Sequence, residues 1–359
     1  MTYDEKIMRN CIRLAEKGRV LPNPMVGCII IKNSEIIGKG FHKLFGGPHA
    51  EVIALNDAKK RGYDLKGASL YVNLEPCSHF GKTPPCADLI ISEGIKKVII
   101  GMKDPNPLVS GKGMRKLQRN GIEVVSGICE NECRELNKVF ISVISKKRPY
   151  VILKSAQSID GKIALNNFSS KWITGIKSRT LAHEIRSFCD GILIGRNTAE
   201  IDNPELTARL NLHPKNPVRI VIDKNLKLKG NLKLFNDESS PAVIVHSSLK
   251  KPVKKILNAD YLPVKEKNGA LDLADLLHKL FLKGIYSLLV EGGSKTLSGF
   301  LKQDLFDEIF VMIAPKIFGK GISTFSDFEI DRSAKAKELF LYKVIRLDND
   351  IVLNYKPNH

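Results

Sequence analysis

The feature that most constrains this chain is the spacing of one histidine, one glutamate and two cysteines between residues 49 and 86. His49 is followed two places later by Glu51, and a proline precedes each of Cys77 and Cys86. Imidazole and thiolate bind zinc well, and three such ligands leave the fourth tetrahedral position open to water. The fold must therefore bring three separate stretches together around one metal ion, with Glu51 beside it.

A zinc ion with one open position lowers the pKa of its bound water to ~7, so that hydroxide becomes available at neutral pH. Glu51 can then take the proton of that water and hand it to a leaving amino nitrogen, which is the division of roles in zinc deaminases. The general deaminase signature has two residues between its cysteines, whereas eight separate Cys77 from Cys86. The longer insert indicates a particular subfamily of these enzymes.

The flanking sequence places these residues at the ends of helices. An apolar-periodic run predicts a helix over residues 49–61, with Glu51 in its first turn. Two prolines precede Cys86, and the following run predicts a helix to about Glu93. A helix N-terminus favours the thiolate form of a cysteine. A lone His49 and Glu51 would usually mark an exposed helix start, and cysteines are often buried as small hydrophobic residues. The four residues together, in this order, favour the metal site.

With 359 residues the chain is long enough for two domains, each with its own core. The charged stretch 146–149 ends in a proline and is the best linker, so we expect a deaminase domain over residues 1–146 and a second domain over 150–359. Strands alternate with helices, which predicts layered α/β architecture. The expected strands are 26–31, 36–41, 68–74, 97–101, 151–154, 162–165, 191–195, 218–223, 242–246, 287–291, 307–314, 339–347 and 351–355, and the further helices are 4–18, 178–188 and 271–282. Thr174 or Ser178 is the expected N-cap of the 178–188 helix.

A glycine pair follows the strand expected at 287–291 and leads into an apolar helical stretch. A strand, a turn without side chains and a helix N-terminus with free amides together form an arrangement that holds a phosphate. A Gly-Gly turn between a strand and a helix is also commonplace, so Gly292 and Gly293 do not decide the matter by themselves.

The net charge of +19 raises the question of nucleic acid, because clustered lysine and arginine neutralise phosphates. The basic residues are spread along the whole chain, without an arginine-rich block, and only 7% of residues are aromatic. We therefore expect no nucleic-acid partner and interpret the charge as solvated surface, with some cations available for a phosphorylated small molecule. No apolar run has membrane-spanning length, the N-terminus does not resemble a signal peptide, and seven scattered cysteines form no disulfide framework. We expect a cytoplasmic protein without a membrane partner.

Several blocks of the sequence closely resemble the bifunctional deaminase/reductase of riboflavin biosynthesis. These are residues 22–27, 73–77 and 85–86 in the first half and, in the order of the family, residues 154–162, 172–174, 203–209 and 290–293 in the second. The resemblance implies an α/β fold with an N-terminal cytidine-deaminase-like layered domain and a C-terminal dihydrofolate-reductase-like domain. It also implies one zinc ion per chain and NADPH as the cofactors. We expect a homo-oligomer.

The contacts of this family can be carried over residue by residue. The implied NADPH contacts are Ala156, Trp172, Thr198, Asp202, Gly293, Ser294, Lys295, Thr296, Leu297, Ser298 and Gly299, and we add Lys224 as a partner for the 2′-phosphate. The implied substrate contacts are Ser170, Arg186, Leu206, Arg209 and Glu291 in the second domain and Asn23, His42, Lys82 and Asn106 in the first. Arg186 and Arg209 have the fork geometry that suits a ribose phosphate. Several alternatives stay open: a core role for Trp172, a turn role for Asn23, and surface positions for His42, Lys224 and the two arginines.

The resemblance implies a two-step reaction on a phosphorylated pyrimidine. A diaminopyrimidinone ribosylamino-phosphate first loses the amino group at C2 as ammonia, and NADPH then donates hydride to the ribose carbon and opens the sugar to a ribityl chain. A nucleobase or tRNA deaminase with a fused accessory domain is the alternative. It would share His49, Glu51 and the cysteines, but it explains neither the long cysteine loop nor the second domain. A nucleic-acid-binding module without catalysis explains still less.

Overall fold

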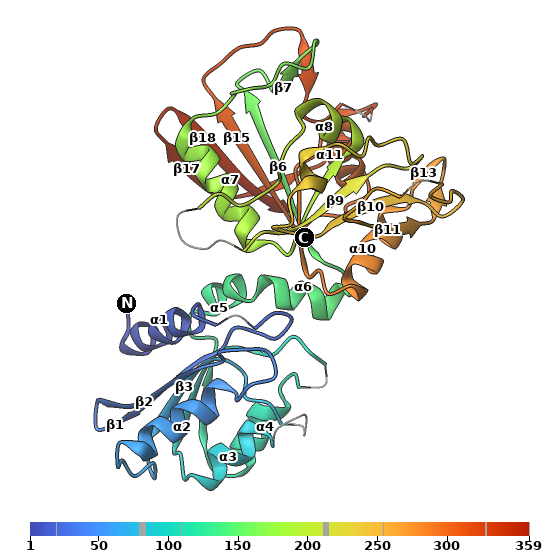
Figure 1. Cartoon of the computed structure of the whole chain (residues 1–359). Helices are drawn as coiled ribbons and strands as arrows, with labels where there is room; N and C mark the ends of the chain where they lie inside the picture. Colours follow the sequence, from blue (N-terminus) through green and yellow to red (C-terminus); the bar gives the residue numbers. More distant parts are fainter. Residues whose placement is uncertain are drawn as a thin grey trace. The chain divides into compact units, whose positions relative to one another are not determined.

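The chain forms two compact units, Met1–Lys147 and Arg148–His359, in a computed structural model (Figure 1). The structure describes residues 1–18, 20–78, 84–107, 109–210, 215–253, 255–326 and 329–358. Within these ranges, no helix combines the length and the apolar character needed to cross a membrane.

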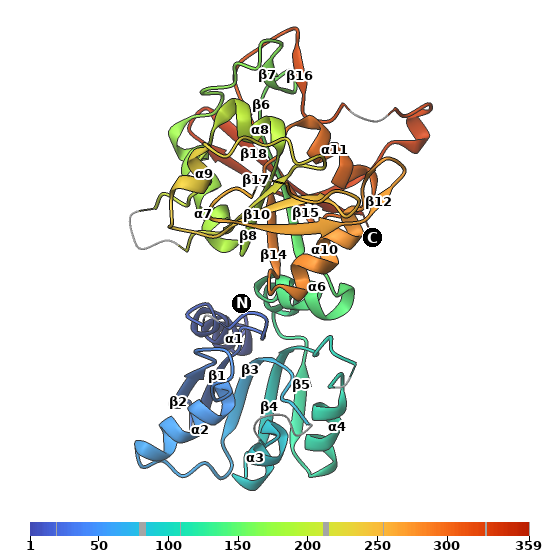
Figure 2. The same ribbon diagram turned by 45° about the vertical axis from the view of Figure 1, so that its right-hand side comes forward.

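The first unit is built on a five-stranded sheet in the order β2-β1-β3-β4-β5, which Figure 2 shows side by side in this sequence. The strands are β1 (Gly27–Lys32), β2 (Glu35–Phe41), β3 (Ser69–Leu74), β4 (Lys97–Met102) and β5 (Glu123–Ser126), and the helices are α1 (Tyr3–Ala15), α2 (Ala50–Lys60), α3 (Cys86–Ser92), α4 (Lys112–Arg119), α5 (Glu130–Leu136) and α6 (Lys138–Lys146). β1 pairs antiparallel with β2 and β3, whereas β3, β4 and β5 are parallel.

Two apolar cores make this unit a three-layer structure. One core joins a face of the sheet to α2, α3 and α4 and includes Ala54, Ile90 and Leu117. The other joins the opposite face to α1, α5 and α6 and includes Met8 and Phe140. Strands buried on both faces are expected to be almost continuously apolar, as β1 and β4 are.

The strands predicted over residues 26–31 and 36–41 are confirmed, and they form a hairpin in which β1 and β2 are joined at Asn33 and Ser34. Both turn residues have positive φ, 48° and 64°, as a two-residue hairpin turn of type I′ requires. β3 and β4 are parallel neighbours, so the segments that follow them meet at the carboxyl ends of these strands. These segments carry Cys77 after β3 and Asn106 after β4.

The second unit is built on a nine-stranded sheet in the order β11-β10-β9-β8-β14-β6-β15-β18-β17. Its strands are β6 (Tyr150–Ser158), β8 (Gly191–Gly195), β9 (Val218–Ile222), β10 (Ala242–Ser247), β11 (Ala259–Val264), β14 (Ser287–Val290), β15 (Glu308–Ala314), β17 (Leu339–Leu347) and β18 (Asp350–Pro357); two small ladders pair β7 (Lys162–Leu165) with β16 (Gly321–Ser323) and β12 (Glu266–Lys267) with β13 (Ala270–Leu271). The helices are α7 (Ile176–Phe188), α8 (Arg196–Asp202), α9 (Lys233–Asn236), α10 (Leu273–Leu282) and α11 (Ser294–Lys302), with a 3-10 turn at Ser333–Lys335.

The strands from β11 to β15 are parallel. β18 pairs antiparallel with β15, and the edge strand β17 pairs antiparallel with β18. β14 lies between β8 and β6, so three parallel strands end side by side at the carboxyl edge of the sheet. Ligands of open α/β sheets bind outside the carboxyl ends of the strands, at the point where the loops after two adjacent strands lead to opposite faces of the sheet. The loops after β6, β8 and β14 are therefore the expected place for a ligand site.

The prediction that Thr174 or Ser178 caps the helix over residues 178–188 is wrong. α7 begins earlier, at Ile176, and its N-cap is Gly175. Asp350, from β18, accepts a hydrogen bond from the Gly175 amide (2.7 Å) and from the Ser178 hydroxyl (2.6 Å). A carboxylate at a helix N-terminus satisfies a free amide and complements the helix dipole. A cap that comes from a distant strand leaves no local sequence signal.

Two of the helices that the sequence did not predict are α4, which begins at Lys112, and α8, which ends at Asp202. Both helices are short, and a strong apolar period cannot develop over so few residues.

Candidate active sites

Three side chains that the sequence predicted as metal ligands meet at the carboxyl edge of the first sheet. His49 is the N-cap residue of α2, Cys86 is the first residue of α3, and Cys77 follows β3. Their ligand atoms lie within 4.8 Å of one another. The His49 Nδ1 atom is 3.2 Å from the Cys86 sulfur and 3.6 Å from the Cys77 sulfur. Zinc bound tetrahedrally to nitrogen and sulfur would hold such atoms about 3.5 Å apart, so the donor set fits this ion.

The protonation of this cluster favours thiolate character at Cys77. A hydrogen bond from the Cys86 side chain, helped by His49 and the Cys86 amide, lowers the pKa of Cys77 to about 4. The Cys86 amide lies 3.3 Å from the Cys77 sulfur. The same sulfur raises the pKa of Cys86 and of His49 through hydrogen bonds. An anionic sulfur with a backbone donor is the form that binds a metal.

Glu51 lies in the first turn of α2, two residues beyond the N-cap, and is buried, with 4% of its surface exposed. Burial raises the pKa of its carboxyl, and the nearby positive charge of His49 offsets only part of that effect. A carboxyl with a raised pKa exchanges protons in both directions more readily near neutral pH than an exposed glutamate does. Its surroundings therefore suit a proton shuttle.

Glu75, to which the sequence assigned no role, ties the two loops at this edge together. Its buried carboxylate accepts hydrogen bonds from the backbone amides of Asp104, Gly111 and Met114 at 2.9 to 3.2 Å. A Cβ atom at Gly113 would lie 2.0 Å from the Pro76 carbonyl oxygen, so only glycine permits this approach. The segment that carries Asn106 is therefore fixed against the segment that carries Cys77. Only the position of Glu75, two residues before a ligand, could have suggested this.

The four predicted substrate residues of the first unit differ in their placement. Asn23 is half-buried and contacts His42, whose ring stands edge-on to His49 with 5.8 Å between centroids. Asn106 is half-buried, and its backbone N–H donates a hydrogen bond to the Asp104 carboxylate. Lys82 lies outside the described residues.

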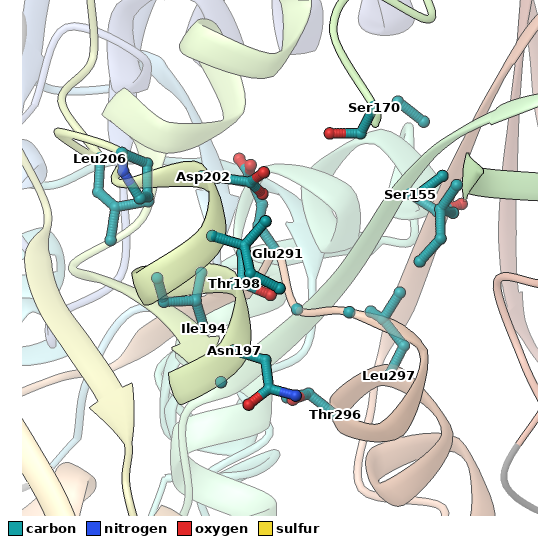
Figure 3. Close-up of a pocket in the computed structure, with 18 of the residues that line it drawn as sticks. Ser155, Ser170, Ile194, Asn197, Thr198, Asp202, Leu206, Glu291, Thr296 and Leu297 are labelled. Carbon is teal, nitrogen blue, oxygen red and sulfur yellow. The ribbon is translucent and has the colours of Figure 1, made fainter. Parts of the chain in front are cut away.

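The second unit contains a large cavity of about 1220 Å³ at the carboxyl ends of β6, β8 and β14. Figure 3 shows part of its lining, with Thr198 and Asp202 on α8, Thr296 on α11 and Ser170 in the loop after β7. The predicted residues that line the cavity are Ala156, Ser170, Trp172, Arg186, Thr198, Asp202, Leu206, Arg209, Lys224, Glu291, Gly293, Ser294, Lys295, Thr296 and Leu297. Ser298 and Gly299 lie further along α11 and are not among the lining residues.

The floor of this cavity is the turn between β14 and α11. A Cβ atom at Gly292 would lie 2.4 Å from the Cβ of Thr296, so a glycine is required where the helix starts so close to the strand. Gly293 is the N-cap, and a glycine has no side chain with which to cap the helix. Gly293, Ser294 and Lys295 at the start of the helix line the cavity, and the backbone amides of a helix N-terminus suit a phosphate of a dinucleotide.

A largely buried carboxylate between two cations forms one wall. Glu291 receives two hydrogen bonds of 2.8 Å from Arg186, and Lys154 is 3.7 Å away. Burial alone would raise the pKa of Glu291, but the charges of Arg186 and Lys154 outweigh it and lower the pKa to about 2. The remaining Arg186 bond goes to the Thr207 carbonyl. Lys154 begins one of the segments that resemble the family, but no role was predicted for it, because its ion pair with Glu291 depends on how the strands are arranged in the sheet.

Trp172 is not a core residue, since 65% of its surface is exposed and its ring lines the cavity. The Arg179 guanidinium stacks over that ring at 4.7 Å. Lys224 forms an ion pair with Glu266 at 2.8 Å, so its charge is already partnered. Burial raises the pKa of Asp202, with Lys171 and Ser170 opposing the change.

Comparisons with known proteins cover both halves of the chain. Residues 1–102 match the family model of the cytidine and deoxycytidylate deaminase zinc-binding region, and residues 149–353 match that of the RibD C-terminal domain. Riboflavin biosynthesis protein RibD of Aquifex aeolicus (strain VF5) is 43% identical, over 98% of each chain. The Escherichia coli (strain K12) protein of the same name is 37% identical, over 96% of each. A crystal structure of a diaminohydroxyphosphoribosylaminopyrimidine deaminase/5-amino-6-(5-phosphoribosylamino)uracil reductase from Thermotoga maritima has a TM-score of 0.86, with 41% identity and 99% coverage of both chains.

The fold and the two sites define a bifunctional enzyme, in which a zinc-dependent deaminase domain is joined to an NADPH-dependent reductase domain. The chain belongs to the RibD family of riboflavin biosynthesis proteins. The α/β fold class predicted for the two halves is confirmed, and a nucleobase or tRNA deaminase with an accessory domain is not favoured.

Proposed function

We propose that the chain deaminates 2,5-diamino-6-ribosylamino-4(3H)-pyrimidinone 5′-phosphate and then reduces the ribosyl chain with NADPH, giving 5-amino-6-ribitylamino-uracil 5′-phosphate. The observation that carries the proposal is the presence, in one chain, of a three-ligand metal cluster with a buried glutamate and a dinucleotide-sized cavity. We assign the first step to residues 1–146 and the second to residues 150–359.

In the first site, His49, Cys77 and Cys86 would hold the zinc ion. When bound, zinc supplies a water of lowered pKa as the nucleophile. Glu51 takes a proton from that water and delivers one to the departing amino nitrogen at C2. Asn23 and Asn106 approach from two loops and orient the pyrimidine, and Lys82 is proposed to meet the phosphate.

In the second site, NADPH supplies hydride to the ribose carbon. The amides of the turn from Gly293 into α11 hold its phosphates, Trp172 packs on it, and Lys224 meets the 2′-phosphate after releasing Glu266. The wall formed by Glu291, Arg186 and Lys154 binds the sugar. Solvent delivers the proton to the reduced product, so no side chain acts as a general acid, and catalysis of the hydride transfer comes from holding the two reactants in position.

The contacts of Arg186 change its proposed role. Its Nε and Nη2 atoms donate to Glu291 and its Nη1 atom donates to Thr207, so no face of the fork is directed at a phosphate. We assign to Arg186 the positioning of Glu291, whose carboxylate accepts hydrogen bonds from ribose hydroxyls. Arg209 is more exposed, has a weaker partner in Glu205 at 3.8 Å, and is the proposed phosphate contact.

We infer a cytoplasmic enzyme that takes no nucleic-acid partner and forms a homo-oligomer. Support for the last point comes from β17, the edge strand of the large sheet. Its Phe340, Leu341 and Val344 side chains are 57%, 45% and 56% exposed, on both faces of the strand. An apolar edge strand is a site of association. Light scattering of the wild type and of Val344→Lys measures whether that edge holds copies together.

The decisive assay supplies the diamino nucleotide and NADPH to the zinc-loaded chain and follows ammonia and the nicotinamide absorbance together. The proposal expects one ammonia and one oxidised NADPH per substrate, with ammonia released first. A structured tRNA and a free nucleobase serve as competing substrates. Ammonia from either of these, and none from the nucleotide, would favour the alternative deaminase.

A further inference from the structure

A chain of hydrogen bonds runs from the backbone next to His49 to the side chain of Asn23. His42 follows β2 and is buried, with 3% of its surface exposed. Its Nδ1 atom is 2.9 Å from the Pro48 carbonyl oxygen, and its Nε2 atom is 3.3 Å from Asn23 Nδ2. Both ring nitrogens are therefore engaged within the protein. His42 is not free to contact a substrate through either nitrogen.

The carbonyl of Pro48 fixes the proton on the ring. A carbonyl oxygen only accepts, so Nδ1 must carry the hydrogen, and Nε2 of the neutral ring is left with a lone pair. Only the amide nitrogen of Asn23, and not its oxygen, can satisfy that lone pair. The Asn23 side chain is thereby held with its Oδ1 atom turned away from His42. In the described part of the chain, no hydrogen bond to that oxygen is found.

The backbone around Asn23 is held independently. Asn73 accepts from the Gly27 amide at 2.8 Å and donates to the Met25 carbonyl at 3.0 Å. Asn137 accepts from the Met25 amide at 2.8 Å. The loop is therefore anchored two residues beyond Asn23, independently of His42.

We propose that His42 is a positioning residue that fixes Asn23 as a hydrogen-bond acceptor toward the substrate, so that the deaminase site selects a pyrimidine presenting an N–H group at that edge. The inference rests on the proposed function and deepens it, because it gives the polarity of the contact. A ring that presents an acceptor there would face an unmatched oxygen, which costs binding. It also replaces the expectation that His42 itself contacts substrate.

The tautomer of His42 tests the proposal without substrate. Full-length, zinc-loaded protein labelled with 15N-histidine gives separate nitrogen resonances for Nδ1 and Nε2, and the His42→Gln variant identifies the His42 signals. We expect a protonated Nδ1 and an unprotonated Nε2. A protonated Nε2 in the wild type would overturn the proposal, whether or not the pyrimidine nucleotide is the substrate.

A double-mutant cycle tests the route through Asn23. For ammonia release from the diamino nucleotide, His42→Leu should raise KM about 10-fold, equivalent to about 1.4 kcal/mol, and leave kcat within about twofold. In the Asn23→Ala background the same substitution should add nothing, because no amide remains to orient. Asn23→Asp, which keeps an acceptor, should bind substrate better than Asn23→Ala. Additive effects of the two substitutions, with normal zinc content, would show that His42 acts independently of Asn23 and would overturn the proposal. If the wild type releases no ammonia, the proposed function is refuted, and the tautomer measurement still tests the role of His42.

Discussion

The two sites of this chain are built in different ways. The metal cluster draws on three short stretches, and two of its ligands lie at helix starts that the sequence itself signals. The reductase cavity draws on the ends of β6, β8 and β14 and on the loops and helices that follow. A site whose chemistry needs a rare ligand set is recognisable from residue types and spacing, whereas a site made of common residues is recognisable only from the order of many weak blocks.

The largest expected effect comes from removing one ligand. Cys86→Ser should reduce the zinc content to well below one ion per chain and lower ammonia release by about 10³-fold or more, because several kcal/mol of transition-state stabilisation are lost. NADPH oxidation with the deaminated intermediate should persist. Cys129→Ser is the matched control, since Cys129 lies outside the metal cluster. Metal analysis and both activities are measured; full zinc content in Cys86→Ser would remove this residue from the ligand set.

Glu291→Gln should damage the other site and leave the first intact. The substitution leaves Arg186 and Lys154, whose side chains are 14% and 13% exposed, without their anion, and removing one partner of such a largely buried pair typically costs about 3 kcal/mol in stability. Because the pKa of Glu291 is lowered to about 2, from an unfolded value of about 4.3, the folded state binds fewer protons between these values. The carboxylate therefore stabilises the fold above pH about 4.3, and this stabilisation is lost as the pH falls toward 2.

Urea unfolding of the wild type and Glu291→Gln across pH 2 to 7 measures this difference, which should shrink with acidity. Glu205→Gln provides the control, because its side chain is 43% exposed and its ion pair with Arg209 is long. A constant difference between wild type and Glu291→Gln at every pH would contradict the paired carboxylate.

A smaller effect concerns cofactor choice. If Lys224 meets the 2′-phosphate, Lys224→Ala should raise the KM for NADPH about 10-fold and leave the KM for NADH nearly unchanged, since a charge-assisted contact of about 1.4 kcal/mol is lost. The initial rate of nicotinamide oxidation gives both constants. Equal changes for the two cofactors would mean that the ion pair with Glu266 is the main role of Lys224.

The smallest expected effect tests the remote cap. Asp350→Ala should lower stability by about 1 kcal/mol, because it removes the acceptor for the Gly175 amide and the Ser178 hydroxyl. Asp348→Ala is the control, since its ion pair with Lys177 is exposed on both sides. Thermal unfolding compares the two variants, and equal midpoints would show that the cap contributes nothing.

The fold was largely predictable because strands such as β4 and β8 are short apolar runs between turn residues. The ligands and Glu51 were predictable because their chemistry needs particular residue types. The α7 cap from Asp350, the pairing of Arg186 with Glu291, and the three amides gathered by Glu75 were not predictable. Each of these contacts joins residues far apart in the chain, and no local pattern records them.

The central claim is that one carboxylate beside the metal cluster serves the first reaction and has no part in the second. It is tested most directly by zinc-loaded Glu51→Gln, assayed with the diamino nucleotide for ammonia and with the deaminated intermediate for NADPH oxidation. We predict that ammonia release falls by about 10² to 10⁴-fold while NADPH oxidation stays within about twofold of wild type. Ammonia release that persists in this variant, with zinc still bound, would contradict the account.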